Sequence, residues 1–112
     1  MITLYGIKNC DTVKKARRWL EDHDVEYQFH DFREDGLNKT QLKGWVETQG
    51  WEAIVNKRST TWRNLSDKEK DISSNAQAVK LLAENPTLIK RPVTEKNNTL
   101  LIGFKETEFQ QL

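Results

Sequence analysis

The chain has 112 residues, a length that fits one domain. Its 18 Lys and Arg residues nearly balance 17 Asp and Glu residues, and the formal net charge of +1 excludes a global field that would attract nucleic acid or an anionic membrane. The apolar runs are far shorter than the ~20 residues that span a bilayer. Because the N-terminus also lacks the basic start and apolar core of a secretory signal, we expect a cytoplasmic protein.

The sequence contains one cysteine, Cys10, which cannot close an intramolecular disulfide. This excludes a disulfide scaffold and agrees with a reducing compartment. The two histidines, His23 and His30, do not stand at metal-ligand spacing from the thiol, so we expect no metal site.

The first third of the chain predicts a strand, a helix and a second strand. Residues 2–7 are β-prone, and residues 25–32 alternate between apolar and polar side chains. Between them a helix is expected from Asp11 to about His23, with Asp11 or Thr12 as its N-cap or a first-turn residue. A strand, helix and strand within about thirty residues are typical of a βαβ unit with parallel strands.

The middle of the chain reads as helical. A helix is expected after an N-cap at Asn38 or Thr40, ending at Gly50. Residues 53–55 read as an apolar link, and residues 59–65 and 66–72 as short helical turns or loop. A longer helix begins near Ser74 and stops at Asn85 and Pro86. Its expected apolar side is formed by Val79, Leu82 and Ala83.

The last third predicts two short strands, at Val93 and at residues 99–102, joined by a turn at Asn97 and Asn98. Residues 105–112 follow as a final helix. The periodicity supports a mixed α/β domain. The order of elements is similar to a thioredoxin-like sheet that has helices inserted between its two halves.

Cys10 is predicted to lie where the first strand meets the first helix. The unpaired amides and the dipole of a helix N-terminus favour a thiolate, and thiol pKa values in such positions fall from about 8.5 to roughly 3.5–7.5. Lys8, Lys14 and Lys15 flank the thiol in sequence. The alternative is a small buried hydrophobic residue, which is the ordinary role of a free cysteine.

Four segments resemble the family of arsenate reductases (ArsC) and Spx proteins, and within it the single-cysteine, YffB-like branch. The first is LYGIKNCDT at residues 4–12, followed by residues 14–16 and 19–20. The second is RSTTWRNL at residues 58–65. The third is residues 85–92, NPTLIKRP, and the fourth is Gly103 with Phe104.

The resemblance implies a thioredoxin-like βαβ…ββα fold, in one domain of residues 1–112 with a helical insertion over roughly residues 37–85. It also implies that Cys10 is the nucleophile of a thiol-dependent reaction. Arg58 and Arg91 match two arginines that surround the thiolate in glutaredoxin-linked arsenate reductases, where guanidinium groups bind an anion by paired hydrogen bonds. Their alternative role is a surface salt bridge. Pro92 matches the cis-proline that thioredoxin-like folds share.

Two positions depart from the family pattern. Gly103 and Phe104 stand where arsenate reductases carry a third arginine, which weakens the set that would clamp arsenate. Val13 stands where Spx regulators carry a second cysteine, three positions after the first. An internal dithiol switch is therefore impossible, and an external thiol must complete any catalytic cycle.

We therefore expect a glutathione-dependent thiol oxidoreductase with no bound cofactor. Glutathione serves as cosubstrate and glutaredoxin as a further partner. The expected substrate or glutathione contacts are Asn9, the amides of Asp11 and Thr12, Lys14 and Pro92. Two alternatives remain open: a non-catalytic, Spx-like protein that binds RNA polymerase, and an arsenate reductase proper.

Overall fold

The structure is a computed structural model that describes residues 1–112. The chain forms two compact units. The sheet unit contains residues 1–36 and 91–112, and the helical unit contains residues 37–90. The prediction that the whole chain is a single domain stays a prediction. None of the helices is long and apolar enough to cross a membrane.

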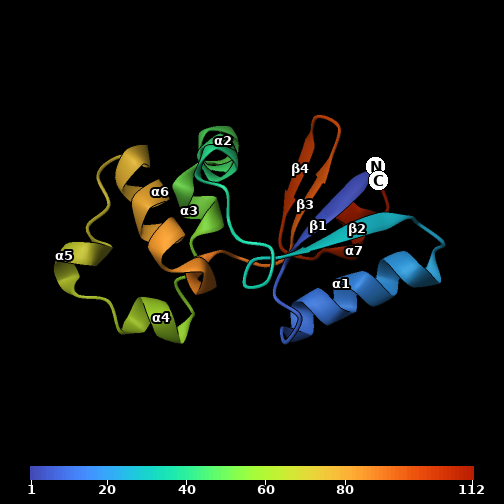
Figure 1. The fold of residues 1–112 in the computed structure, drawn as a ribbon, viewed down its shortest axis with the longest axis horizontal. Coiled ribbons are helices and arrows are strands. Elements are labelled where there is room, and N and C mark those ends of the chain that lie inside the picture. The colour runs from blue at the N-terminus through green and yellow to red at the C-terminus, as the bar shows by residue number, and fades with distance from the viewer. The chain divides into compact units, whose positions relative to one another are not determined.

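The sheet unit contains four strands in the order β2-β1-β3-β4 (Figure 1). The strands β1 and β2 are parallel, with Leu4 opposite Phe29. β3 runs antiparallel to β1, and β4 runs antiparallel to β3. The mixed α/β prediction and its βαβ…ββα order are confirmed. The element bounds are β1 Ile2–Gly6, α1 Asp11–Asp22, β2 Tyr27–Asp31, β3 Val93–Lys96, β4 Thr99–Ile102 and α7 Glu106–Phe109.

One edge of this sheet gathers residues from all four strands. The strand directions bring the C-terminal ends of β1, β2 and β4 to the same edge as the N-terminal end of β3. The Gly103 amide donates to the Pro92 carbonyl at 2.8 Å, which joins the end of β4 to the start of β3. Cys10 is the N-cap of α1, the helix that follows β1. We call this the thiol edge: residues 7–10, Asp31, Pro92 and Gly103.

The core of the sheet unit joins β1 to both of its helices. Leu4 of β1, Ala16 and Leu20 of α1 and Phe109 of α7 form one buried cluster. The Phe109 ring meets the Trp19 ring edge-on, with 5.6 Å between their centroids. Burial of these apolar side chains, at roughly 1.5–3 kcal/mol for each large one, fixes α1 against the sheet and so fixes the position of its first turn.

The helical unit is built around the packing of two longer helices, α2 and α6 (Figure 1). A short bridge pairs Val55 with Ile89. The Asn56 amide donates to the Leu88 carbonyl at 2.7 Å, and the Lys90 amide donates to the Ile54 carbonyl at 2.8 Å. The elements are α2 Lys39–Gln49, α3 Trp51–Ile54, α4 Thr60–Arg63, α5 Asp67–Lys70, α6 Asn75–Glu84 and the 3-10 helix η1 Pro86–Leu88.

Several predicted ends of elements are confirmed. Asn38 caps α2 by accepting from the Gln41 amide, and Ser74 caps α6 in the same way. Gly50 has a φ of 83°, a value that glycine adopts without strain, and it ends α2. Asn97 has a φ of 53° in the turn between β3 and β4.

Two expectations about the helical unit were wrong. The predicted apolar link at residues 53–55 belongs largely to α3, because Gly50 turns the chain and lets a new helical turn begin at Trp51. The fully buried side of α6 is formed by Ala78, Leu81 and Leu82, while Val79 and Ala83 are half-buried. The predicted and the observed set of residues both have helical spacing in the sequence. Tertiary packing buries the set that contains both leucines.

Gly6, at the end of β1, lies against the first turn of α1. A methyl group added at Gly6 would come within 2.7 Å of Cγ2 of Val13. Val13 is fully buried, and its β-branched side chain has little rotational freedom to give way. The absence of a side chain at position 6 therefore sets how closely α1 approaches the strand.

We predict that Gly6→Ala lowers the free energy of unfolding by about 1–3 kcal/mol, the usual cost of overpacking a tight core. Gly44→Ala is the matched control, because Gly44 lies inside α2 with nothing within 4 Å of an added methyl group. That substitution should raise the free energy of unfolding by about 0.5–1 kcal/mol. Urea denaturation measures both, and a Gly6→Ala protein as stable as the parent would contradict the packing argument.

Candidate active site around Cys10

Cys10 is itself the N-cap of α1. Its backbone is extended, with φ −115° and ψ 123°, and its carbonyl accepts the Lys14 amide at 2.9 Å. Asp11 and Thr12 were expected as N-cap or first-turn residues, and the first-turn alternative is confirmed: α1 begins at Asp11, and Asp11 is its acidic first-turn residue. The thiol carries no capping hydrogen bond and is half-exposed.

The N-cap position determines which amides the side chain of Cys10 can reach. An N-cap side chain accepts from the amides of the second and third helical residues, which here are Thr12 and Val13. The predicted contacts of the amides of Asp11 and Thr12 with the thiolate or its transition state stay a prediction. The helix begins at Asp11, so its first amides have no partner within the helix. They are available to a thiolate or to an anion bound to it.

The other residues expected near the thiol differ in what they offer. Asn9, Asp11, Thr12 and Lys14 all lie at the start of α1 and are exposed. The Asp11 carboxylate suits the helix dipole but repels a second anion. Lys14 is the cation that the first turn of α1 presents to solvent.

Lys8 is not the free cation that its position in sequence suggested. Its Nζ lies 2.9 Å from a carboxylate oxygen of Glu34, and both side chains are more than half exposed. The hydrogen bond and the charge of Glu34 raise the pKa of Lys8 above its usual value. Glu34 therefore neutralises much of the charge that Lys8 would bring to the thiol edge.

Arg91 and Pro92 reach the thiol edge directly before β3. The peptide bond between them is cis, as the family resemblance implied for Pro92. Pro92 is buried and Arg91 is half-buried. The structure thus places Arg91, Pro92 and Cys10 in the same sheet unit, at the same edge of the sheet.

Arg58 lies in the helical unit. It is exposed, and its backbone amide donates to Oδ1 of Asn56 at 3.1 Å. Its predicted role beside the thiolate stays a prediction. Within its own unit, Arg58 directly precedes Ser59, whose hydroxyl caps α4 by accepting the Trp62 amide.

Asp31, at the end of β2, is a residue of the thiol edge that the sequence analysis missed. It is only 3% exposed, and its carboxylate accepts backbone amides from Lys8, Arg33 and Glu34. Burial raises the pKa of Asp31, but these hydrogen bonds outweigh it and hold the pKa below its usual value of 3.8. The available sequence signal was an acidic residue that ends a strand and precedes a turn.

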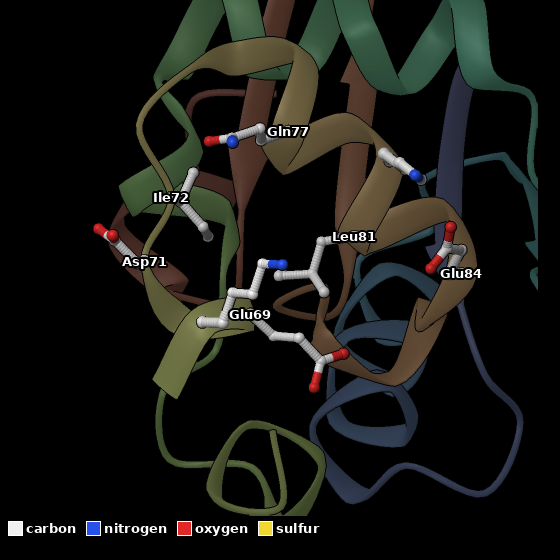
Figure 2. A pocket seen from close by; sticks show the side chains of 8 residues that line it. Glu69, Asp71, Ile72, Gln77, Leu81 and Glu84 are labelled. Atoms are coloured by element: carbon white, nitrogen blue, oxygen red, sulfur yellow. The ribbon is translucent and has the colours of Figure 1, made fainter. Parts of the chain in front are cut away.

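A separate pocket of about 250 Å³ lies in the helical unit (Figure 2). Ile72 and Leu81 contribute apolar surface, and charged side chains of both signs surround them. None of the predicted site residues lines it, so it adds nothing to the thiol chemistry. In the whole chain no three His, Cys, Asp or Glu side chains are grouped so that they could hold a metal ion.

Comparison with known proteins identifies the class of this fold. A solved structure of a protein named YffB superposes with a TM-score of 0.94 and 40% identity, covering 99% of this chain and 97% of that one. An arsenate reductase (ArsC) related protein from Brucella melitensis superposes with a TM-score of 0.79 and 42% identity, covering 98% of this chain and 92% of that one. These are thioredoxin-like α/β proteins.

The family follows from the sequence matches. The model of the ArsC family matches residues 5–112. A global transcriptional regulator Spx of Streptococcus mutans is 33% identical over 112 residues, which cover 98% of this chain and 81% of the regulator. The chain belongs to the ArsC family, as its four sequence segments had indicated.

The lowered pKa of Asp31 predicts how stability depends on pH. A carboxylate stabilised in the fold contributes stability above its unfolded pKa and loses it as the pH falls through its lower folded pKa. The parent protein should therefore lose stability below about pH 4 more steeply than Asp31→Asn, which cannot ionise. Guanidinium denaturation over this acidic range measures both slopes. Parallel curves would show that Asp31 ionises alike in the folded and unfolded chains.

Proposed function

We propose that the protein is a thiol-dependent oxidoreductase in which Cys10 is the nucleophile and glutathione is the cosubstrate. One observation carries the proposal: the half-buried Cys10 is the N-cap residue of a helix of 12 residues, at the sheet edge that Arg91 also reaches. Membership of the ArsC family supports the same chemistry. An N-cap thiol gains from the helix amides only as an anion, which is the reactive form of cysteine.

The proposed reaction is thiol–disulfide exchange. The Cys10 thiolate attacks one sulfur of a disulfide, a new S–S bond forms, and the second sulfur leaves as a thiolate that takes up a proton. Because the chain has no second cysteine, a glutathione thiolate attacks the mixed disulfide and releases Cys10 as a thiolate. This first cycle leaves glutathione in a mixed disulfide with one half of the substrate. In a second cycle Cys10 attacks the glutathione sulfur of that disulfide and releases the substrate half as a thiolate, and a second glutathione then frees Cys10 and leaves as glutathione disulfide.

The surrounding residues have distinct roles in this proposal. The amides of Thr12 and Val13 stabilise the thiolate at the start of α1. Arg91, beside Pro92, binds a carboxylate of glutathione through paired hydrogen bonds. For Arg58, in the helical unit, an anion-binding role rests on the family resemblance alone. The exposed polar residues of the first turn complete the glutathione site: Asn9, Asp11, Thr12 and Lys14.

Substitution of the nucleophile tests the chemistry. The parent protein should form one mixed disulfide with glutathione disulfide, and added glutathione should reverse it. Cys10→Ser should form none, because a serine hydroxyl stays protonated and does not attack sulfur. Intact-mass spectrometry follows the adduct, and circular dichroism checks that the variant folds. Reductase turnover that survives in a folded Cys10→Ser protein would exclude the mechanism.

Arg91→Ala tests recognition of the anion. We expect adduct formation with glutathione disulfide to slow by roughly ten- to a hundredfold, since a hydrogen bond to a charged group contributes about 1.5–3 kcal/mol. The rate with the uncharged hydroxyethyl disulfide should change little. Arg18→Ala, which removes an exposed arginine from α1, is the control. Equal slowing of both disulfides would assign Arg91 a structural role instead.

A second candidate function is binding to RNA polymerase without catalysis. The 33% identity to a global transcriptional regulator, over nearly the whole chain, favours it. Purified polymerase should then retain the protein on a column, and Cys10→Ser should be retained equally. Loss of retention on that substitution would tie binding to the thiol.

A third candidate is arsenate reduction, favoured by the likeness to an ArsC-related protein of Brucella melitensis. Gly103, at the thiol edge, leaves this edge without the third arginine that the family resemblance implies for arsenate. Oxidation of glutathione that requires arsenate and glutaredoxin would establish this activity, and its absence would leave disulfides as the proposed substrates.

A further inference from the structure

Asp31 connects two segments that are far apart in the sequence. Its Oδ2 accepts the Lys8 amide at 3.1 Å, 23 residues away. Its Oδ1 accepts the Arg33 amide at 2.7 Å and the Glu34 amide at 3.2 Å. One oxygen thus holds the loop that leads to Cys10, and the other holds the turn that follows β2.

The connection lies in a buried place. Asp31 is 3% exposed, and the Phe32 amide next to it donates to the Gly6 carbonyl at 2.9 Å, where the ladder between β1 and β2 ends. An ionised carboxylate that accepts amides away from water forms hydrogen bonds stronger than neutral ones. The loop of residues 7–10 is therefore held at Lys8, two residues before the thiol.

We infer that Asp31 is a positioning residue for Cys10: through the Lys8 amide its carboxylate holds the loop that places the thiol at the N-terminus of α1. We call the hydrogen bond from the Lys8 amide to the Asp31 carboxylate the clamp. Its role rests on the proposed function, because the position of the thiol matters for activity only if Cys10 is the nucleophile. Without the clamp, the loop moves and the thiol spends less time facing the amides of Thr12 and Val13.

The structure offers a matched control on the same loop. The side chain of Lys8 pairs with Glu34, and this pair joins the same two segments as the amide clamp does. Because its members are 54% and 60% exposed, water and salt weaken the pair. Lys8→Ala removes the ion pair and keeps the backbone amide. Asp31→Asn keeps the ion pair and leaves a single acceptor oxygen for three amides.

The test measures iodoacetamide alkylation of the folded protein, in which Cys10 is the only thiol. For each variant the rate near neutral pH is divided by the rate at about pH 10, where an ordinary thiol is fully ionised. This ratio reports how far the fold favours the thiolate, and a residue that only stabilises the fold does not change it. We expect the ratio to fall several-fold in Asp31→Asn and to stay constant in Lys8→Ala.

Each other result overturns the inference. An unchanged ratio in a folded Asp31→Asn protein would limit Asp31 to stability. A higher ratio would show that its negative charge, rather than its clamp, acts on the thiol. A fall in Lys8→Ala equal to that in Asp31→Asn would assign the positioning to the ion pair.

A second measurement keeps the inference testable if Asp31→Asn does not fold. In the parent protein, hydrogen exchange of the Lys8 amide should be as slow as that of amides within β1, because this amide donates to the buried carboxylate of Asp31. Fast exchange at Lys8 would overturn the clamp. Neither measurement involves glutathione or turnover, so failure of the clamp and failure of the proposed function are separate results.

Discussion

The central position of β1 in the sheet is the constraint on which the thiol site depends. The strand pairs with β2 on one side and with β3 on the other, so its C-terminal end lies between the ends of both neighbours. Leu4 anchors α1 beneath it, and Gly6 lets Val13 pack against the strand. Together these contacts determine where α1 begins, and Cys10 stands at that point.

In the proposed function, the residues at this edge have different roles. The start of α1 supplies amides, cis-Pro92 and Arg91 come from the start of β3, and Asp31 ties the thiol loop to the end of β2. The lack of a second cysteine makes the thiol depend on an external reductant in the proposed chemistry. The catalytic proposal requires Cys10 itself, whereas the polymerase-binding alternative requires only the surface of the fold.

Local signals predicted much of this structure. Helix ends can be predicted from sequence because side-chain caps and positive φ values depend only on neighbouring residues, as at Asn38, Gly50 and Ser74. The family segments predicted the fold and the cis peptide bond at Pro92, and the catalytic role of Cys10 stays a prediction. Sequence placed the helix start at Asp11, where the structure has it, but did not single out Cys10 as the N-cap, because a cysteine is an uncommon N-cap by residue type.

Two features needed the tertiary structure. Asp31 carries no local signal for its contact with Lys8, since 23 residues separate them and only the parallel pairing of β1 with β2 brings them together. Similarly, the sequence places Lys8 two residues from the thiol, but only the structure shows that its side chain pairs with Glu34. Long-range hydrogen bonds of single polar residues leave no periodic pattern in a sequence, unlike the apolar stripes of α1 and α2.

The measurement that tests the central claim most directly compares Cys10 in the folded protein with Cys10 in the same chain unfolded in urea. Both are alkylated with iodoacetamide at neutral pH, and the single thiol makes the rates directly comparable. If the start of α1 activates the thiol, the folded protein should react about two- to fourfold faster, because the gain in thiolate exceeds the loss of intrinsic nucleophilicity. A folded protein that reacts more slowly than the unfolded chain would contradict the account and make Cys10 a structural residue.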